Sequence, residues 1–479
     1  MALRLPALSP VAWTTIERVT QQALWLILFA ILAPILGPRP YGLFAIAMGF
    51  VGFCEFVLLE GAIEALVTVP DLDRHHTKTA NLANATLAIG LSAAISALAP
   101  AIGLLYHDHN IKLIIWALAP LPPLASLSAV PIAVLRRSLS YKELAVRSIA
   151  GLVIGGVIGI IAGLAGAGVW ALTLQVLAQR LAEFIIVWIA APVRLRFGWS
   201  RTHFRELSPV AINVLVARTM SLANGIVPRL ILGYTLGATE LGLFTFANRI
   251  LEIIVQTAIV PLTSVGRIEL RGAQLGSVEF KKTFARMTQN VSVLAFPLLL
   301  GAAAIMPDLF RLGLGLSWQG GVVPAQLLLL SGPPLVLFYC IDAALLAANQ
   351  SSLFKWISTV QMLSITVLVL CVSTLGLDVV CIALAVRPWL ILPFLLRILQ
   401  RSCQVPVLNI LRLPLVSLCG AISMALVLSL PYLRPSGFRH TFELILPVAV
   451  GVAFYGIFLF SFSRNQLKSV VAGIITHRP

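Results

Sequence analysis

Six arginines lie within stretches of the sequence that are otherwise apolar enough to cross a membrane. They are Arg18, Arg180, Arg218, Arg229, Arg249 and Arg387. An ionised side chain inside a bilayer costs at least ~2.5 to 3.5 kcal/mol on insertion scales, so each arginine needs a partner, water or a ligand. Guanidinium groups bind phosphate oxygens bidentately and keep their protons when they are buried. These arginines therefore indicate recognition of a phosphate-bearing molecule.

Two of the six have an acidic neighbour one helical turn away. Arg180 precedes Glu183 and Arg249 precedes Glu252. Ion pairs within one helix explain such spacing, and this interpretation is favoured more for Arg180 than for Arg249. The arginines without an acid within four residues are Arg218, Arg229 and Arg387. Each of these needs a partner from another helix, from water or from a ligand.

The surroundings of Arg18 recur two hundred residues later around Arg218. Residues 18–50 and 218–250, aligned without gaps, are identical at ten of thirty-three positions, and LGPRPYGLF and LGATELGLF keep the same internal spacing. We interpret them as two copies of one membrane unit, in which Gly37, Pro38 and Pro40 break the first copy's helix and Gly237 breaks the second. Across a pseudo-two-fold axis, Arg18 and Arg218 would face each other in a cavity. The alternative is that both reach out to the lipid headgroups.

Polar side chains near these arginines are candidates for binding the rest of a ligand. Arg218 and Arg229 are eleven residues apart, about 16 Å along a helix, and therefore on nearly the same face. The candidates for stacking and hydrogen bonding are Gln21, Gln22, Trp25, Asn213 and Asn224. Trp and Asn more often anchor or join helices in membrane bundles, so a structural role stays open for each.

Acidic residues in the apolar stretches are candidates for ion coupling or gating. They are Glu17, Glu55, Glu252 and Asp342. Glu55 is the best candidate for protonation or cation binding because it is predicted to lie deepest in its span. Glu60 and Glu64 share a helix face, and we expect them to pair with Arg74, Lys78 or a gate arginine.

Composition and patterning predict an all-α polytopic membrane protein. Of the 479 residues 59% are hydrophobic and 11% charged, and the mean hydropathy is +0.98. Apolar stretches of membrane-spanning length give about fourteen predicted helices. The first predicted helix contains Glu17 and Arg18 and no cleavage site follows it, so we expect it to be retained.

Six spans separate the two copies of the repeat, so both copies run through the membrane in the same direction. This predicts six-helix lobes over 1–207 and 208–410, with a helix pair and cytoplasmic tail over 411–479.

The distribution of positive charge predicts the orientation in the membrane. With the N-terminus inside, the cytoplasmic segments hold 23 of the 34 Lys and Arg, and the opposite side holds five. The positive-inside rule therefore places both termini in the cytoplasm. The same distribution accounts for the net charge of +16 without a nucleic-acid partner, because no separate basic domain exists.

We expect no disulfide, since the six cysteines lie in or beside apolar spans without CxxC spacing. We also expect no metal site, since HDH at 107–109 is typical of a solvated loop.

Several segments together resemble the bacterial polysaccharide flippases, a branch of the superfamily of multidrug, oligosaccharidyl-lipid and polysaccharide exporters. The segments are LGPRPYGLF after a helix with Glu17 and Arg18, LGATELGLFTFANRI, the basic LRRSLSYKEL, and GLSWQGG. The resemblance covers most of the chain. It implies a two-lobed transporter of twelve or fourteen helices in the bacterial inner membrane. Such a transporter moves a polyprenyl-diphosphate-linked oligosaccharide to the outer leaflet.

The expected activity is transport by alternating access around a cationic cavity, for the assembly of exopolysaccharide, capsule or O-antigen. No P-loop or other catalytic constellation is present, so an enzyme is not expected. We expect no cofactor, although a sodium or proton gradient or the membrane potential could drive transport. Expected partners are the lipid-linked oligosaccharide diphosphate and membrane lipids, with glycosyltransferases and a polysaccharide polymerase as further candidates. Two alternatives stay open: a multidrug or small-solute antiporter of the same superfamily, and a non-transporting scaffold of an envelope-assembly complex.

Overall fold

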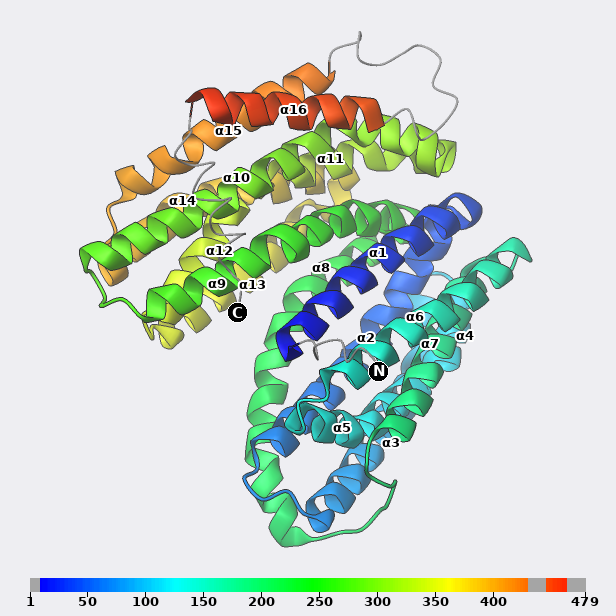
Figure 1. Ribbon diagram of the computed structural model, residues 1–479. Coiled ribbons are helices and arrows are strands. Elements are labelled where there is room, and N and C mark those ends of the chain that lie inside the picture. Colours follow the sequence, from blue (N-terminus) through cyan, green and yellow to red (C-terminus); the bar gives the residue numbers. More distant parts are fainter. Residues whose placement is uncertain (1–8, 430–444, 463–479) are drawn as a thin grey trace, which may run out of the picture. The chain divides into compact units, whose positions relative to one another are not determined.

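The computed structural model describes residues 9–429 and 445–462, and every regular element within those ranges is a helix (Figure 1). This confirms the predicted all-α class. The chain forms two compact units, Met1–Gly242 and Leu243–Pro479, which are described separately below.

The first unit contains seven helices and most of an eighth. Their bounds are α1 Pro10–Leu36, α2 Pro38–Thr68, α3 Arg74–Leu105, α4 His109–Leu118, α5 Leu121–Arg137, α6 Tyr141–Leu164, α7 Val169–Ala190 and α8 Arg201–Ile254. The helix α8 continues into the second unit and is interrupted by non-helical backbone at Gly237.

The second unit continues from α8 through a π-helical segment and further long helices. The bounds are η1 Val255–Ile259, α9 Val260–Arg271, α10 Val278–Leu309, η2 Phe310–Leu314, η3 Leu316–Gly321, α11 Val322–Leu330, α12 Gly332–Ala347, α13 Ser351–Val372, η4 Ser373–Leu375, α14 Leu377–Cys403, α15 Val407–Ser429 and α16 Ile445–Phe462.

The helices expose apolar side chains on the faces that do not pack inside their unit. On α6, for example, Val157 and Ile161 are 51% and 62% exposed, whereas Gly155 and Gly159 on the other face are buried. A long helix that is apolar all round and only half buried matches a lipid environment. Among the described residues, ten helices are long and apolar enough to span a membrane, or eleven if the bent pair Leu316–Leu330 and Gly332–Ala347 is one span. The protein is thus a multi-pass membrane protein, and the number fourteen stays a prediction.

The two copies of the sequence repeat adopt the same backbone turn. Gly37 has φ 74° and ψ 176°, and Gly237 has φ 86° and ψ 176°, a conformation that is almost restricted to glycine. The predicted helix breaks at these two positions are therefore confirmed.

The two turns also pack against each other reciprocally. A Cβ at Gly42 would lie 1.7 Å from the carbonyl oxygen of Ala238, and a Cβ at Gly242 would lie 2.0 Å from that of Pro38. Each glycine thus admits the backbone of the other copy's turn. This reciprocity is what a repeat packed on itself requires, and it explains why the second glycine of each LGxxxxGLF segment recurs.

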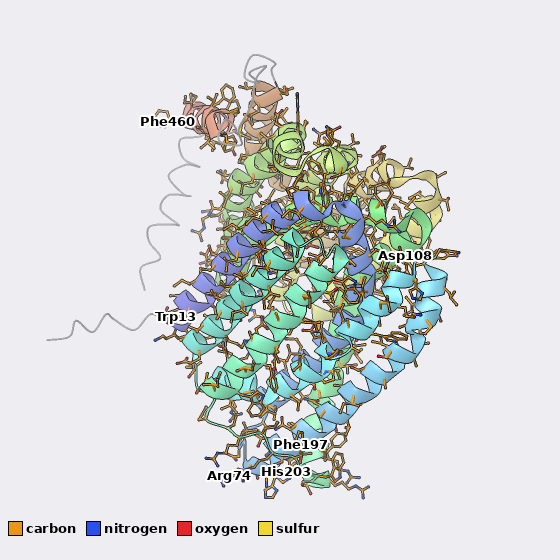
Figure 2. The ribbon with its side chains drawn as sticks, turned by 90° about the vertical axis from the view of Figure 1, so that its right-hand side faces the viewer. Trp13, Arg74, Asp108, Phe197, His203 and Phe460 are labelled. Atoms are coloured by element: carbon orange, nitrogen blue, oxygen red, sulfur yellow. The ribbon has the colours of Figure 1, made fainter. Side chains whose placement is uncertain are left out.

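Charged residues lie at the two ends of α3. Figure 2 shows Asp108 just beyond one end and Arg74 at the other. Asp108 caps α4 by accepting a hydrogen bond from the backbone N–H of Asn110, and it pairs with Arg39 at 2.9 Å. Burial alone would raise the pKa of Asp108, but the bonds from Arg39 and Asn110 outweigh it and lower the pKa. Asp108 of the HDH segment is therefore joined by an ion pair to Arg39, in the first turn of α2.

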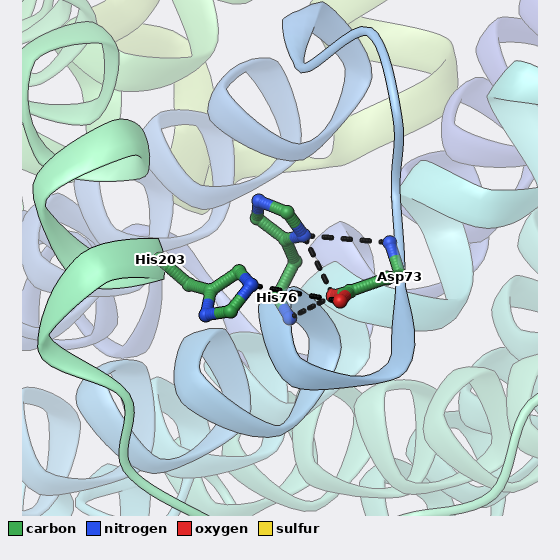
Figure 3. A group of neighbouring side chains, drawn as sticks. All are labelled: Asp73, His76 and His203. Carbon is green, nitrogen blue, oxygen red and sulfur yellow. Dashed lines mark hydrogen bonds and ion pairs between the residues drawn. The ribbon is translucent and has the colours of Figure 1, made fainter.

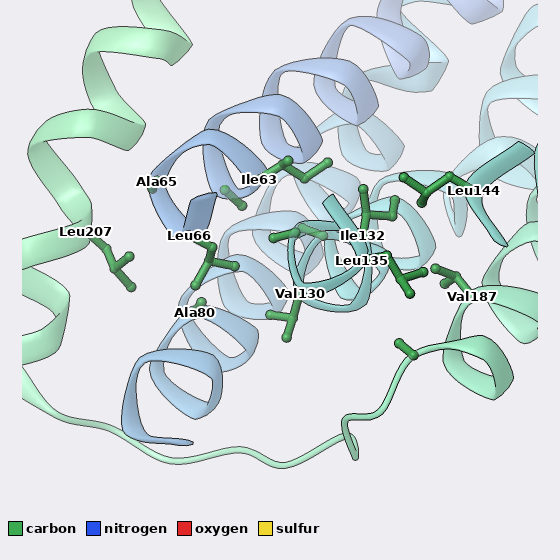
Figure 4. Packing of buried hydrophobic residues seen from close by; sticks show 14 residues of the cluster. Ile63, Ala65, Leu66, Ala80, Val130, Ile132, Leu135, Leu144, Val187 and Leu207 are labelled. Atoms are coloured by element: carbon green, nitrogen blue, oxygen red, sulfur yellow. The ribbon is translucent and has the colours of Figure 1, made fainter. Parts of the chain in front are cut away.

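A cluster of small and branched side chains holds the opposite end of the first unit together. It joins α2, α3, α5, α6, α7 and α8 (Figure 4), and its members Ile63, Ala129 and Val187 are fully buried. Alanines let these helices approach closely, as is typical of membrane bundles.

Candidate functional site

A stripe of glycines on α6 makes room for a polar stripe on α7. A Cβ added at Gly151 would lie 2.5 Å from Cγ of Glu183, and one at Gly155 would lie 2.4 Å from the carbonyl oxygen of Gln175. A Cβ at Gly159 would lie 2.8 Å from the Cβ of Gln175. Because glycine has no side chain, α6 and α7 approach closely enough to enclose Gln175, Gln179 and Glu183, which are all buried.

A buried ion network extends from this polar stripe to α2. Arg180 Nε lies 2.7 Å from Oε1 of Glu55, and Arg180 Nη1 donates to Oε2 of Glu183 at 2.9 Å. Gln179 donates to the other oxygen of Glu183, also at 2.9 Å. Glu55 and Glu183 are only 4% and 7% exposed. The ion pair predicted between Arg180 and Glu183 is therefore confirmed, and Glu55 shares the same arginine.

A second arginine brings the formal charge of this network close to zero. Arg147 on α6 interacts electrostatically with Glu183 and, more weakly, with Glu17, and it donates to Ser148 at 3.3 Å. The two carboxylates of Glu55 and Glu183 are thus balanced by the guanidinium groups of Arg180 and Arg147. Removing one member of such a network leaves an opposite charge buried without its partner.

Arginines of α5 pair with the C-terminal part of α2. Arg136 lies 3.7 Å from Glu60 and 3.6 Å from Glu64. The expected partner of these two acids is Arg74, Lys78 or a gate arginine, and the structure shows an arginine beside both carboxylates, Arg136 of the LRRSLSYKEL segment. Arg137 donates to the carbonyl oxygens of Leu66, Val67, Val69 and Pro70, which the end of α2 leaves without helical partners.

The residues proposed to bind the ligand's phosphates lie on α1 and α8. Arg18 is exposed, and among the described residues it forms no hydrogen bond or ion pair. Gln22 and Trp25, one and two turns further along α1, are half-buried, as are Glu17 and Arg229. The side chains of Arg218 and Asn224 lie outside the described residues, although both positions are helical.

The candidates in the second unit lie on α8, α12 and α14. Arg249 pairs with Glu252 at 3.3 Å, and Asn248 donates to Glu252 at 2.7 Å, so the predicted pair within one helix is confirmed. Asp342 and Glu252 both lie close enough to Tyr339 for their charges to act on its hydroxyl.

Arg387 has no acid nearby in the sequence, and its partners come from another helix. It donates to the hydroxyl of Ser364 at 2.8 Å and to the carbonyl oxygen of Gln361 at 2.7 Å, both on α13. Ser364 and Gln361 also line a pocket between α13 and α14, together with Arg397 and Arg401.

Sequence reasoning missed Arg147, Gln175 and Gln179. Arg147 lies near the start of α6, before the apolar stretch of that helix. One signal could have found the others: Gly151, Gly155 and Gly159 repeat every four residues, as do Gln175, Gln179 and Glu183. Matching spacings of this kind indicate two facing helix stripes.

Comparison with known proteins places this architecture. A family model described as "Polysaccharide biosynthesis protein" matches residues 31–323, more than half of the chain. The succinoglycan biosynthesis transport protein ExoT of Rhizobium meliloti (strain 1021) is 22% identical over 310 residues, 64% of this chain and 62% of that protein. The matched segment thus spans less than two thirds of that relative.

Solved structures show the same fold at low identity. The lipid II flippase MurJ in an inward closed conformation superposes with a TM-score of 0.74 at 15% identity, over 96% of this chain and 99% of that one. An inward-facing multidrug resistance MATE family transporter gives 0.57 at 13% identity, over 90% and 100%. The chain therefore belongs to the polysaccharide biosynthesis protein family, and it shares its fold with these two membrane proteins.

Proposed function

We propose that this protein is a flippase that moves a polyprenyl-diphosphate-linked oligosaccharide from the cytoplasmic to the outer leaflet of the bacterial inner membrane. Its product would feed the assembly of exopolysaccharide, capsule or O-antigen. Membership of a polysaccharide biosynthesis family supports the pathway, and the fold shared with a lipid II flippase supports the type of transport.

The observation that carries the proposal is the contrast between paired and available arginines in the first unit. Arg180 and Arg136 are engaged by carboxylates, whereas Arg18 is exposed and unpaired among the described residues. Arg18 and its repeat equivalent Arg218 are the cations we assign to the diphosphate, with Arg229 and Arg249 as further contacts. Gln22, Trp25 and Asn224 are assigned to the sugar.

Alternating access is the mechanism we propose, with lobes over 1–207 and 208–410 as its moving parts and both termini in the cytoplasm. Moving the diphosphate outward from an inside-negative cell gains ~2.3 kcal/mol per charge per 100 mV, so the membrane potential can drive transport. Protonation or sodium binding at Glu17, Glu55, Glu252 or Asp342 would couple a gradient to the same cycle.

A multidrug antiporter is the competing function, because the MATE transporter shares the fold. Cationic drugs need unpaired acids inside the membrane. In the first unit Glu55, Glu60, Glu64 and Glu183 all lie within 4 Å of an arginine nitrogen. This pairing favours an anionic ligand.

The test is transport by purified protein in proteoliposomes. One set carries a fluorescent polyprenyl-diphosphate oligosaccharide, and a second set is loaded with a cationic dye. We expect protein-dependent flipping of the lipid-linked sugar and no dye transport. Dye transport without flipping would establish the antiporter, and inactivity with both, in protein shown to be folded, would favour the scaffold.

A further inference from the structure

A group of metal-ligating side chains lies at the end of the first unit that is predicted to face the cytoplasm. It consists of Asp73, His76 and His203 (Figure 3). Asp73 caps α3, His76 is in the first turn of α3, and His203 is in the first turn of α8. One ligand atom from each residue lies within 4.8 Å of the other two. This group lies outside the ion network of α2, α6 and α7.

The three side chains direct their donor atoms toward one another. His76 Nδ1 lies 2.7 Å from Oδ1 of Asp73, and His203 Nε2 lies 3.5 Å from Oδ2 of the same carboxylate. The two imidazole rings are nearly perpendicular, with centroids 4.3 Å apart. His76 is buried at 5% exposure, so its ring is held in this position by packing.

The second nitrogen of each histidine already has an outer partner. His76 Nε2 lies 2.8 Å from Oε2 of Glu206, and His203 Nδ1 lies 2.5 Å from the hydroxyl of Ser200. Histidines that bind metals almost always use their second nitrogen in this way, toward a carboxylate, carbonyl or water, which fixes the ring and raises its basicity. The arrangement thus contains both the inner donors and the outer contacts of a metal site.

We propose that Asp73, His76 and His203 bind one divalent transition metal ion of the zinc class through Oδ2, Nδ1 and Nε2, with Glu206 and Ser200 orienting the two imidazoles. Two nitrogens and one carboxylate oxygen are a common protein ligand set for zinc, and water would take the fourth position. Bonds of about 2.0 to 2.1 Å to a tetrahedral ion place donors roughly 3.3 Å apart. One donor atom from each of the three residues already lies within 4.8 Å of the other two, so these donors need to close by about 1.5 Å at most. Oδ1 of Asp73 stays free to cap α3 through the N–H groups of His75 and His76.

The bound ion would join two segments that are far apart in the chain. Glu206 and His76 are separated by 130 residues, and the first turn of α8 would be tied to the first turn of α3. The competing explanation is that hydrogen bonds alone hold His76 to Asp73 and Glu206, without a metal. The two explanations differ in whether purified protein holds stoichiometric metal.

The experiment uses full-length, tag-free protein in detergent, stripped with a chelator and dialysed against Zn²⁺ or Co²⁺. Bound metal is counted by mass spectrometry, and tetrahedral Co²⁺ is recognised by its intense visible absorption. We expect one ion per chain, loss of binding in His76→Ala and His203→Ala, and a roughly 10- to 100-fold weaker affinity in Glu206→Gln. The matched control is His75→Ala, because His75 stacks on His203 at 5.5 Å but is not one of the three ligands.

The wild-type protein decides the proposal even where a ligand variant fails to fold, a defect that size-exclusion chromatography would reveal. Substoichiometric metal in wild-type protein would overturn the site and leave the hydrogen bonds of His76 as the explanation. Equal loss of metal in the His75→Ala control, or full binding in folded His76→Ala, would overturn the assignment of the ligands.

Discussion

Glu55 and Arg180 show how this protein accommodates charge inside the membrane. Glu55 is 4% exposed and lies 2.7 Å from Arg180, which also holds Glu183. Removing one member of a buried pair leaves an uncompensated charge, which costs far more than the pair itself contributes. The network is therefore a position where single substitutions have large effects.

We expect Arg180→Ala to lower the free energy of unfolding by about 3 to 5 kcal/mol, because Glu55 and Glu183 would lose their common cation. The measurement is the thermal unfolding midpoint in detergent. The matched control is Arg286→Ala, which removes an equally short pair with Glu269 at 2.8 Å whose side chains are 56% and 43% exposed. That exposed pair contributes at most about 1 kcal/mol. Similar midpoints for the two variants would show that the buried network is not held by charge pairing.

The sequence predicts residue contacts well only where both partners share a helix. Arg180–Glu183 and Arg249–Glu252 follow from a spacing of three residues. The pairing of Glu55 with Arg180 depends on how α2 packs against α7, and no local pattern encodes that packing. The meeting of His76 with His203 is missed for the same reason.

The helix α6 is shaped by its glycines on two faces. Gly151, Gly155 and Gly159 admit the polar stripe of α7, whereas a Cβ at Gly156 would meet Leu28 of α1 at 2.5 Å. A helix with so many glycines is intrinsically weak, so its role here is close packing. Gly42 and Gly242 likewise serve close packing, because each admits the backbone of the other copy of the repeat.

We expect Gly155→Ala to destabilise the protein by roughly 1 to 3 kcal/mol, because the new Cβ would lie 2.4 Å from the carbonyl oxygen of Gln175, a backbone atom that cannot rotate away. Thermal unfolding in detergent measures the effect. Gly90→Ala on α3 is the control, since no atom lies within 4 Å of its Cβ position. This control should be neutral or stabilising by up to about 1 kcal/mol. A stabilised Gly155→Ala variant would contradict the close approach of α6 and α7.

The elements themselves could be predicted to a large extent. Hydropathy gave the helical class, and the repeat gave the breaks at Gly37 and Gly237. The start of α6 is less well predicted by hydropathy, because the helix begins at Tyr141 and includes the charged residues Lys142, Glu143 and Arg147 before its apolar stretch. Helix boundaries depend on capping and packing as well as on hydropathy.

At the scale of the whole molecule, the chain is a multi-pass membrane protein of the polysaccharide biosynthesis protein family, and its orientation is a prediction from the distribution of charge. Most Lys and Arg lie in segments predicted to be cytoplasmic, so we expect the turn at Arg39 to lie outside and the α7–α8 connection to lie inside. The side chains of Arg39 and Arg196 are both exposed, so these two positions are suitable for labelling.

We expect a cysteine introduced by Arg39→Cys to react in intact cells with a membrane-impermeant maleimide, and one introduced by Arg196→Cys to react only after the cells are opened. The native protein supplies the background, because its six cysteines are free thiols. The inverse labelling pattern would reverse the orientation and with it the proposed direction of transport.

The central claim is that Arg18 and Arg218 bind the diphosphate of the transported lipid. The most direct measurement is the flipping rate of a polyprenyl-diphosphate oligosaccharide in proteoliposomes that contain Arg18→Ala combined with Arg218→Ala. Hydrogen bonds to charged groups contribute about 1.5 to 3 kcal/mol each, so we predict a loss of at least tenfold, whereas Arg196→Gln in the exposed α7–α8 connection keeps the wild-type rate. Wild-type flipping by the folded double variant would contradict the account.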